Sequence, residues 1–97
     1  MPKAYLVAFY NKVQDPDALA AYAKLAGPAV VANGGRFLGR GGRVKSLEGE
    51  IEERSVIIEF DSFEAAVAHY DSPDYQDALR ALGDGAVRDM RVIEGIE

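Results

Sequence analysis

The order in which hydrophobic spacing changes along the chain constrains the fold most strongly. Residues 4–11 (AYLVAFYN) alternate branched and aromatic side chains, a pattern that is typical of a strand. Asp15 and Pro16 then supply an N-cap and a first helical residue. The apolar positions that follow recur at helical spacing as far as Asn33-Gly34, a typical helix stop. The chain therefore begins with a strand and a helix.

Two further strands follow the first helix. The glycine-rich segment 35–49 predicts a second strand with irregularities, which ends near Gly49. Residues 54–61 predict a third strand. An acidic hairpin that contains Glu50, Glu52 and Glu53 is expected to join the two.

Two prolines predict where the helical regions break. Pro28 cannot donate a backbone hydrogen bond, so we expect the first helix to be kinked or interrupted at Gly27-Pro28. Ser72-Pro73 is expected to restart the second helical region with a new cap. Residues 86–96 then read as the last strand.

The second helical region has two apolar stripes at helical spacing. Its N-cap is either Ser62 or Asp61 together with Glu64. The first half carries the stripe Phe63, Ala66, Val67 and Tyr70. The second half repeats the spacing at Tyr75, Ala78, Leu79 and Leu82, and Gly83 and Gly85 end it.

The element order is therefore β-α-β-β-α-β. Two split βαβ units of this kind form an α+β, ferredoxin-like sandwich, in which a four-stranded antiparallel sheet carries helices on one face. The sequence contains no linker, repeat or low-complexity block, so we expect residues 1–97 to form a single domain.

Both faces of the predicted sheet are apolar. In the first strand, Tyr5, Val7 and Phe9 point one way, and Ala4, Leu6, Ala8 and Tyr10 point the other way. The helices can cover only one of these faces. We therefore expect the second face to meet a second copy of the chain in a homodimer that buries about 800 Å² per partner.

Composition excludes several classes of function. The chain has 11 basic and 16 acidic residues, and the clustered Arg36, Arg40 and Arg43 make only a weak basic patch, so nucleic acid is disfavoured as a partner. The absence of cysteine excludes disulfides and thiolate metal sites. No apolar run approaches the ~20 residues of a membrane helix, and the N-terminus reads as a strand rather than a signal peptide. We expect a cytoplasmic protein without a membrane partner.

One segment, residues 37–46 (FLGRGGRVKS), nearly matches a nucleotide-binding P-loop. Gly39, Lys45 and Ser46 have the right spacing, but Val44 replaces the second glycine. The segment also leads into an acidic hairpin instead of a helix. We interpret its glycines as residues whose backbone freedom permits a bulge or a bend in the second strand.

Four strings resemble a known family. GGRFLGRGG (34–42), LEGE (47–50), VIIEFDSFEAAVAHYDSPDYQDAL (56–79) and RDMRVIEG (88–95) are similar to domain-of-unknown-function family 1330, a group of bacterial proteins in the dimeric α/β-barrel superfamily. The resemblance implies a ferredoxin-like protomer that pairs sheet to sheet. It supplies no reaction, because that superfamily includes cofactor-free monooxygenases, lactone isomerases and haem enzymes.

Charged residues on the predicted strands form the first candidate site. Glu59 lies within an apolar strand, where a carboxylate needs a partner. Arg36 and Arg40 on the second strand point to the same face if no bulge intervenes. One interpretation is a structural Arg–Glu pair. The other is an anion clamp at the mouth of a cavity between the sheet and the helices.

Four ring-bearing residues form the second candidate site. His69 is the only histidine and is expected to be half-buried near a helix end, where it is a candidate general base. With no second His or any Cys, no metal site is expected. Tyr70 and Tyr75 flank the helix break, where a small polar pocket could form, and Tyr5 is expected to face the same space.

Two hypotheses about function follow. In the first, each protomer binds a small organic metabolite in a sheet–helix cavity, with monooxygenase-like or isomerase-like activity that needs no cofactor. Glu59, His69 and Tyr70 are then the candidate catalytic residues, and Arg36, Arg40, Tyr5 and Tyr75 are the candidate ligand-binding residues. In the second, the protein is a non-catalytic ligand-binding or structural dimer. A cavity of about 300 Å³ with convergent polar groups would favour the first hypothesis.

Overall fold

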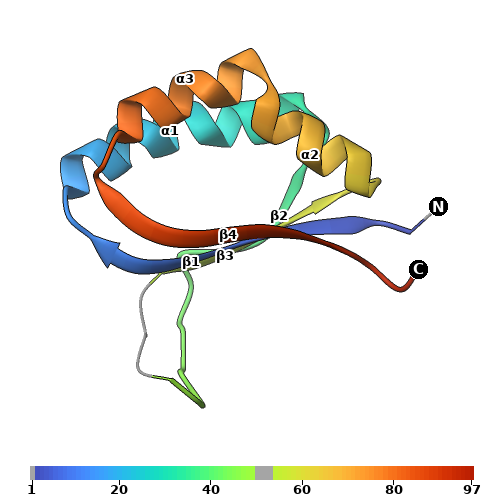
Figure 1. The fold of residues 1–97 in the computed structure, drawn as a ribbon, viewed down its shortest axis with the longest axis horizontal. Coiled ribbons are helices and arrows are strands. Elements are labelled where there is room, and N and C mark those ends of the chain that lie inside the picture. Colours follow the sequence, from blue (N-terminus) through green and yellow to red (C-terminus); the bar gives the residue numbers. More distant parts are fainter. Residues whose placement is uncertain (1, 50–53) are drawn as a thin grey trace.

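A computed structural model, which describes residues 2–49 and 54–97, shows a four-stranded antiparallel sheet with all its helices on one face (Figure 1). The strand order is β2-β3-β1-β4. The strands are β1 (Ala4–Val13), β2 (Arg36–Arg40), β3 (Ser55–Phe60) and β4 (Ala86–Glu94). The helices are α1 (Pro16–Ala32), α2 (Phe63–Asp71) and α3 (Pro73–Leu82). The ferredoxin-like prediction is confirmed, and the predicted acidic hairpin lies outside the described residues.

Each helix begins at a residue whose side chain caps it. Asp15 accepts hydrogen bonds from the backbone of the first turn of α1, Ser62 accepts from Ala65 N, and Ser72 accepts from Tyr75 N. Of the two caps predicted for α2, the structure therefore uses Ser62. None of the helices among residues 2–49 and 54–97 is long and apolar enough to cross a membrane.

Pro28 does not interrupt the first helix. It lies inside α1, which continues to Ala32. Ala29 and Val30, directly after the proline, are fully buried. Tertiary packing of these two residues offsets the missing backbone hydrogen bond, since most helical stability in proteins comes from such packing.

The second strand is much shorter than predicted. β2 ends at Arg40, and segment 41–49 leaves the sheet on the side opposite the helices (Figure 1). Gly41 has a φ of 69°, a conformation that favours glycine, and it turns the chain out of the ladder directly after Arg40. The prediction of a strand to Gly49 is wrong because this turn ends the pairing.

A bulge in β2 separates two arginines that were predicted to share a face. Arg36 is paired with Glu59, but the register shifts between Phe37 and Gly39. One extra residue reverses the alternation of side chains, so Arg40 lies on the helix-covered face with Phe37. The glycine-rich segment therefore contains the predicted bulge. As a result, Arg36 and Arg40 lie on opposite faces of the sheet.

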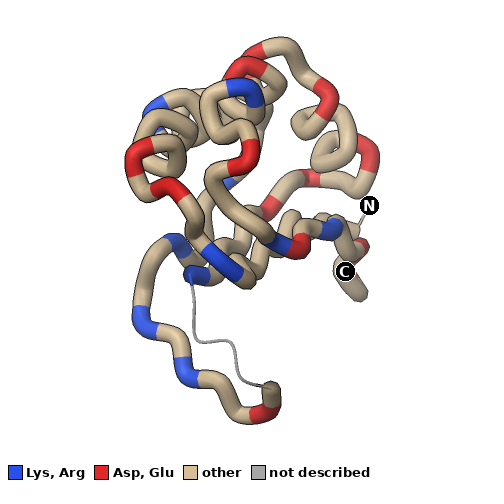
Figure 2. Tube along the Cα trace, turned by 60° about the vertical axis from the view of Figure 1, so that its left-hand side comes forward, with Lys and Arg blue, Asp and Glu red and all other residues tan. Residues whose placement is uncertain are grey.

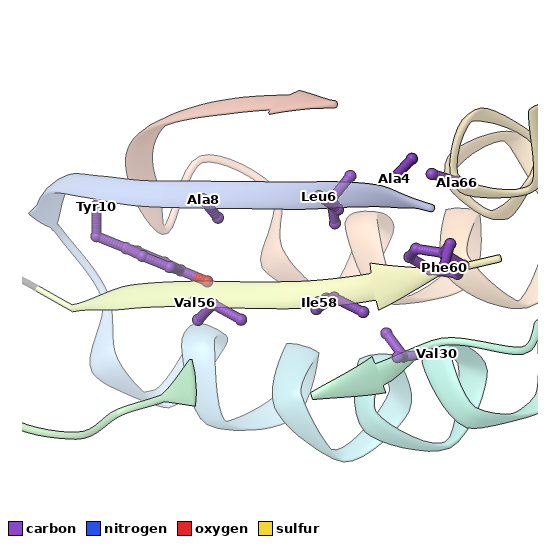
Figure 3. Close-up of a cluster of buried hydrophobic side chains, with 9 residues drawn as sticks. All are labelled: Ala4, Leu6, Ala8, Tyr10, Val30, Val56, Ile58, Phe60 and Ala66. Atoms are coloured by element: carbon purple, nitrogen blue, oxygen red, sulfur yellow. The ribbon is translucent and has the colours of Figure 1, made fainter. Parts of the chain in front are cut away.

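The core lies between the sheet and the helices. Alternate residues of β1 and β3 point into it, with Tyr10 at one end and Phe60 at the other (Figure 3). From α2, the buried residues are Ala66 and His69, whereas Phe63, Val67 and Tyr70 are exposed. The stripe predicted for α2 is thus wrong, because the helix turns its Ala66–His69 side toward the sheet.

No helix covers the opposite side of the sheet, which we call the outer face (Figure 1). Cross-strand pairing places Tyr5 beside Glu59 and Ile93, and Val7 beside Ile57. Residues paired across neighbouring strands share a face. The outer face therefore includes the apolar or aromatic residues Tyr5, Val7, Phe9, Ile57 and Ile93, together with the charged residues Arg36, Glu59, Asp89 and Arg91. The alternation predicted for β1 is confirmed.

Candidate functional site

A small cavity lies between the sheet and α1, with three arginines in its wall. Its volume is about 30 Å³, room for about two water molecules. It opens to solvent at one end, its mouth. The ligand-free volume is about a tenth of the ~300 Å³ that would favour the first hypothesis, so that criterion is not met. Most of the wall is apolar, and its polar residues are Arg40, Arg54, Arg88, Tyr10 and Tyr22. We call this space the sheet–helix cavity.

Strand pairing brings these polar residues together at one end of the sheet. Tyr10 on β1 is paired with Arg88 on β4. On its other side, Tyr10 N donates a hydrogen bond to Arg54 O, directly before β3. Arg40 on β2 lies close to them, because it is paired with Val56, which follows Arg54 by two residues. Residues far apart in the chain thus form one polar end of the cavity.

Three phenols hold the guanidinium of Arg88. Arg88 Nη1 donates to Tyr10 Oη at 2.9 Å and to Tyr22 Oη at 3.1 Å, and Nη2 donates to Tyr75 Oη at 3.4 Å. The Tyr22 and Tyr75 hydroxyls are 2.6 Å apart. Arg88 also stacks on the ring of Tyr22, with its guanidinium carbon 4.7 Å from the ring centre. Arg88 is therefore fixed without a carboxylate partner.

The pKa values of Arg88 and Tyr75 are both raised in this cluster. Burial alone would lower the pKa of Arg88, but the oxygens of Tyr22 and Tyr75 outweigh this effect and raise it above its usual value. Burial, and then proximity to Tyr22, raises the pKa of Tyr75, while Arg88 acts in the opposite direction. The raised pKa values favour a charged guanidinium at Arg88 beside a neutral phenol at Tyr75.

The other two arginines of the cavity have no anionic partner among the described residues. Among residues 2–49 and 54–97, no carboxylate pairs with Arg40 or Arg54. Arg40 instead stacks on Phe37, with its guanidinium carbon 4.4 Å from the ring centre. The Nε atom of Arg54 is buried and makes no hydrogen bond to any described residue. A buried donor of this kind costs about 1–3 kcal/mol while it is unpartnered.

A glycine in α1 makes room for Arg40. A Cβ atom added at Gly27 would lie 3.4 Å from Arg40 Nη1. The guanidinium therefore rests directly on the helix backbone at the mouth of the cavity. Gly27 was expected only to disturb the helix, but its place in the structure is beside this arginine.

Arg36 and Glu59 form an ion pair on the outer face, away from the cavity. Arg36 Nε lies 2.9 Å from Glu59 Oε1, and Arg36 Nη2 lies 3.0 Å from Asp61 Oδ1. The hydrogen bond and charge of Arg36 lower the pKa of Asp61, and the two carboxylates raise the pKa of Arg36. This geometry matches the interpretation of Arg36 and Glu59 as a structural ion pair. Of the two arginines predicted for the anion clamp, only Arg40 lies at the cavity.

His69 is buried rather than half-buried, at only 1% exposure. Its ring lies between those of Phe60 and Tyr75, at centroid distances of 5.2 and 4.6 Å. His69 Nδ1 and Asn33 Nδ2 are 2.9 Å apart, and Nε2 is buried without a partner among the described residues. Burial lowers the pKa of His69, and the nearby charge of Asp74 opposes this shift weakly. His69 does not line the sheet–helix cavity.

Of the three predicted site tyrosines, Tyr70 and Tyr75 lie together, with ring centroids 5.4 Å apart, and Tyr75 also contacts His69, whereas Tyr5 lies elsewhere. Tyr5 lies on the outer face, whereas Tyr75 is buried and reaches the cavity only through Tyr22 and Arg88. Tyr70 is exposed on α2 and lines a second, mainly apolar groove of about 240 Å³ beside β4. The structure therefore does not bring Glu59, His69 and Tyr70 to one place.

Sequence reasoning missed most of the polar residues of the cavity. The sequence pattern assigns Tyr10 only to one face of the first strand, and it does not single out Tyr22 or Arg88 as site residues. A signal for Arg88 was present, since it precedes Met90 by two residues and must share its face of the strand. The same signal was present for Arg54, because the strand predicted over residues 54–61 places it two residues before Val56, on the same face.

The sequence and the fold both match known proteins. Residues 3–96 match the domain of unknown function called DUF1330. The protein belongs to the DUF1330 family. No curated protein matches this DUF1330 chain in sequence.

Several solved structures share the fold of this DUF1330 protein. A protein of unknown function from Rhodopseudomonas palustris has 22% identity and a TM-score of 0.74, covering 99% of this chain and 84% of that one. A proposed antibiotic biosynthesis monooxygenase from Caulobacter crescentus has 21% identity and a TM-score of 0.64, covering 99% and 92%. A dimeric ferredoxin-like protein from Thermobifida fusca has 18% identity and a TM-score of 0.61, covering 96% and 91%.

The environment of His69 predicts a pH dependence of stability. Burial holds its pKa below the ordinary 6.5, so below that pH the unfolded chain binds a proton that the folded protein does not. The free energy of unfolding should therefore fall as the pH drops below about 6.5, by up to about 1.4 kcal/mol per pH unit. Urea unfolding of the parent and of His69→Leu between pH 7 and 5 measures this difference, and the variant should lose that part of the slope.

A second readout covers the case in which His69→Leu does not fold. His69 is the only histidine, so its ring protons can be followed by NMR without ambiguity. A folded-state pKa at or above 6.5 would contradict the burial argument.

Proposed function

We propose that this DUF1330 protein binds a small organic anion in the sheet–helix cavity of each protomer. The observation that carries the proposal is the convergence of Arg40, Arg54 and Arg88 on one cavity without a carboxylate partner among the described residues. The chain as a whole has a net charge of −5, so basic side chains are fewer than acidic ones. The position of three arginines around one mainly apolar cavity therefore favours a negatively charged ligand.

The two unpaired arginines are the groups that a ligand would use. Arg88 already donates to three phenol oxygens, whereas Arg40 and Arg54 donate to no described residue. A carboxylate at the mouth would give the buried Nε of Arg54 an acceptor and would neutralise charge in a partly apolar wall. Figure 2 shows that basic positions continue from this end of the sheet along segment 41–49 until an acidic position near its tip. Segment 41–49 lies on the side of the sheet opposite the cavity, so the arginines of the cavity itself carry the proposal.

An enzymatic reaction on the bound anion is a second candidate, favoured by the hydroxyl of Tyr10. Tyr10 Oη accepts a hydrogen bond from Arg88, and no described residue accepts its own proton. That proton is therefore free to be donated to a ligand oxygen in the cavity. The likeness to the proposed monooxygenase from Caulobacter crescentus agrees with such a reaction but concerns the fold alone.

We further propose that the protein is a homodimer that pairs through the outer face. Phe9, Ile57 and Ile93 are exposed on β1, β3 and β4, on the face that no described helix covers, with Val7 and Tyr5 between them. Segment 41–49, which carries the exposed Leu47, projects on this side, where it would contact a partner (Figure 1). The relative from Thermobifida fusca, described as dimeric, supports this arrangement. A structural dimer without a ligand is the alternative.

The arginine proposal predicts opposite effects on binding and on stability. Arg54→Met should weaken acetate binding about 10-fold to 100-fold, since it removes a charged hydrogen-bond donor. In the absence of ligand it should be at least as stable as the parent, because it removes a buried donor without a partner. Thermal denaturation at constant ionic strength, with chloride replaced by acetate, measures both effects.

Arg43→Met is the matched control, since Arg43 is an exposed arginine on segment 41–49. It should behave like the parent. Equal loss of acetate binding in the two variants would indicate general charge attraction and would contradict a specific site. Loss of stability in ligand-free Arg54→Met would indicate a structural role.

The dimer proposal predicts that a charge on the outer face separates the subunits. Ile57→Asp should sediment as a monomer at micromolar concentration with unchanged helical circular dichroism, because it places a carboxylate in an apolar contact. Val67→Asp is the control, since Val67 on α2 is 39% exposed and Ile57 is 40% exposed. That variant should remain a dimer. A parent protein that is monomeric at this concentration contradicts the proposal.

A further inference from the structure

The wall of the sheet–helix cavity is polar at one end and apolar at the other, and this difference indicates the chemical class of the ligand. We infer that the ligand is an amphipathic monocarboxylate, with its carboxylate at Arg40 and Arg54 and its hydrocarbon part directed toward Leu6, Val30 and Ile58. This inference rests on the proposed function, since it assumes that the cavity binds an anion. It adds the chemical class of the anion and its orientation.

The polar end of the cavity fits a single carboxylate. Arg40 and Arg54 are its unpaired cations, and Arg88 is occupied by phenols. The Tyr10 hydroxyl beside them can donate one further hydrogen bond to a carboxylate oxygen. A second carboxylate would have to lie in the apolar part of the cavity, away from these donors, and burying it there would be unfavourable.

The opposite end of the cavity has no polar side chain. Leu6 lies four residues from Tyr10 on β1, which is about 13 Å along the strand. Leu6 is paired with Ile58, and Ile58 with Phe37, so the wall at this level is apolar on β1, β3 and β2. Val30 of α1 lies above it. A hydrocarbon chain that points inward from the arginines thus meets only apolar surface.

Small side chains leave the space between the two ends open. Ala8 on the sheet and Ala23 and Ala26 on α1 line the middle of the cavity, where larger residues would close it. The ligand-free volume of about 30 Å³ is small, but the cavity opens at the exposed Arg40. A longer hydrocarbon chain would therefore have to displace apolar side chains at the Leu6, Val30 and Ile58 end while Arg40 stays at the carboxylate. The arrangement therefore favours short chains over bulky or branched ligands.

Isothermal titration calorimetry with a series of straight-chain carboxylates tests the inference. With acetate, butyrate, hexanoate and octanoate, affinity should rise about fourfold per added methylene until the cavity is filled, because each methylene leaves water for apolar surface. Hexanol and hexylamine should bind at least 10-fold more weakly than hexanoate, since they lack the charge that the arginines recognise. Succinate should bind no more tightly than acetate.

Two neighbouring isoleucines provide matched variants. Ile58→Val enlarges the apolar end of the cavity by one methylene and should shift the preferred carboxylate toward a longer chain. Ile57→Val makes the same change on the outer face and should leave the preference of the parent unchanged. An identical shift in both variants would contradict the proposed orientation.

The outcomes separate this inference from the proposed function. If acetate and inorganic phosphate bind in an Arg54-dependent manner but chain length has no effect, the cavity binds anions and the amphipathic class is wrong. If hexanol binds as tightly as hexanoate, the class is also wrong. If no carboxylate and no phosphate bind at millimolar concentration, the proposed function fails and this inference fails with it.

Discussion

The alternation of side chains along β1 is the constraint on which the rest of the structure depends. β1 lies between β3 and β4, so each of its residues determines which neighbours share its face. Ala4, Leu6 and Ala8 build the floor of the core and of the cavity, and Tyr10 on the same face ends it at Arg88 (Figure 3). The odd-numbered residues of β1 form the centre of the outer face. A shift of one residue would exchange these two surfaces.

The element order, the helix caps and the two faces of β1 could all be predicted, because each depends on local spacing that the printed sequence shows. The face of Arg40 could not be predicted. It depends on a bulge between Phe37 and Gly39, and one extra residue in a strand reverses every side chain after it. The sequence indicated that glycines permit a bulge there, but not at which residue the register shifts.

The candidate site was harder to predict than the fold because it is assembled by strand pairing. Tyr10, Arg54 and Arg88 become neighbours only when β1 lies between β3 and β4. Single-residue reasoning instead selected Glu59 and His69, which are unusual for their local context. Glu59 is paired with Arg36, and His69 is enclosed by two rings. Glu59 is thus satisfied by its partner, whereas His69, whose Nε2 is buried without a partner among the described residues, lies outside the sheet–helix cavity.

The most direct test of a carboxylate site at Arg40 and Arg54 is the NMR spectrum of the arginine side chains during titration with butyrate. The Nε–H signals of Arg40 and Arg54 should shift and saturate with a common affinity. The signal of Arg36 should not move, because its Nε–H already donates to Glu59, and Arg43 provides an exposed reference. Equal, unsaturated shifts of all four signals, or a stationary Arg54, would contradict the account.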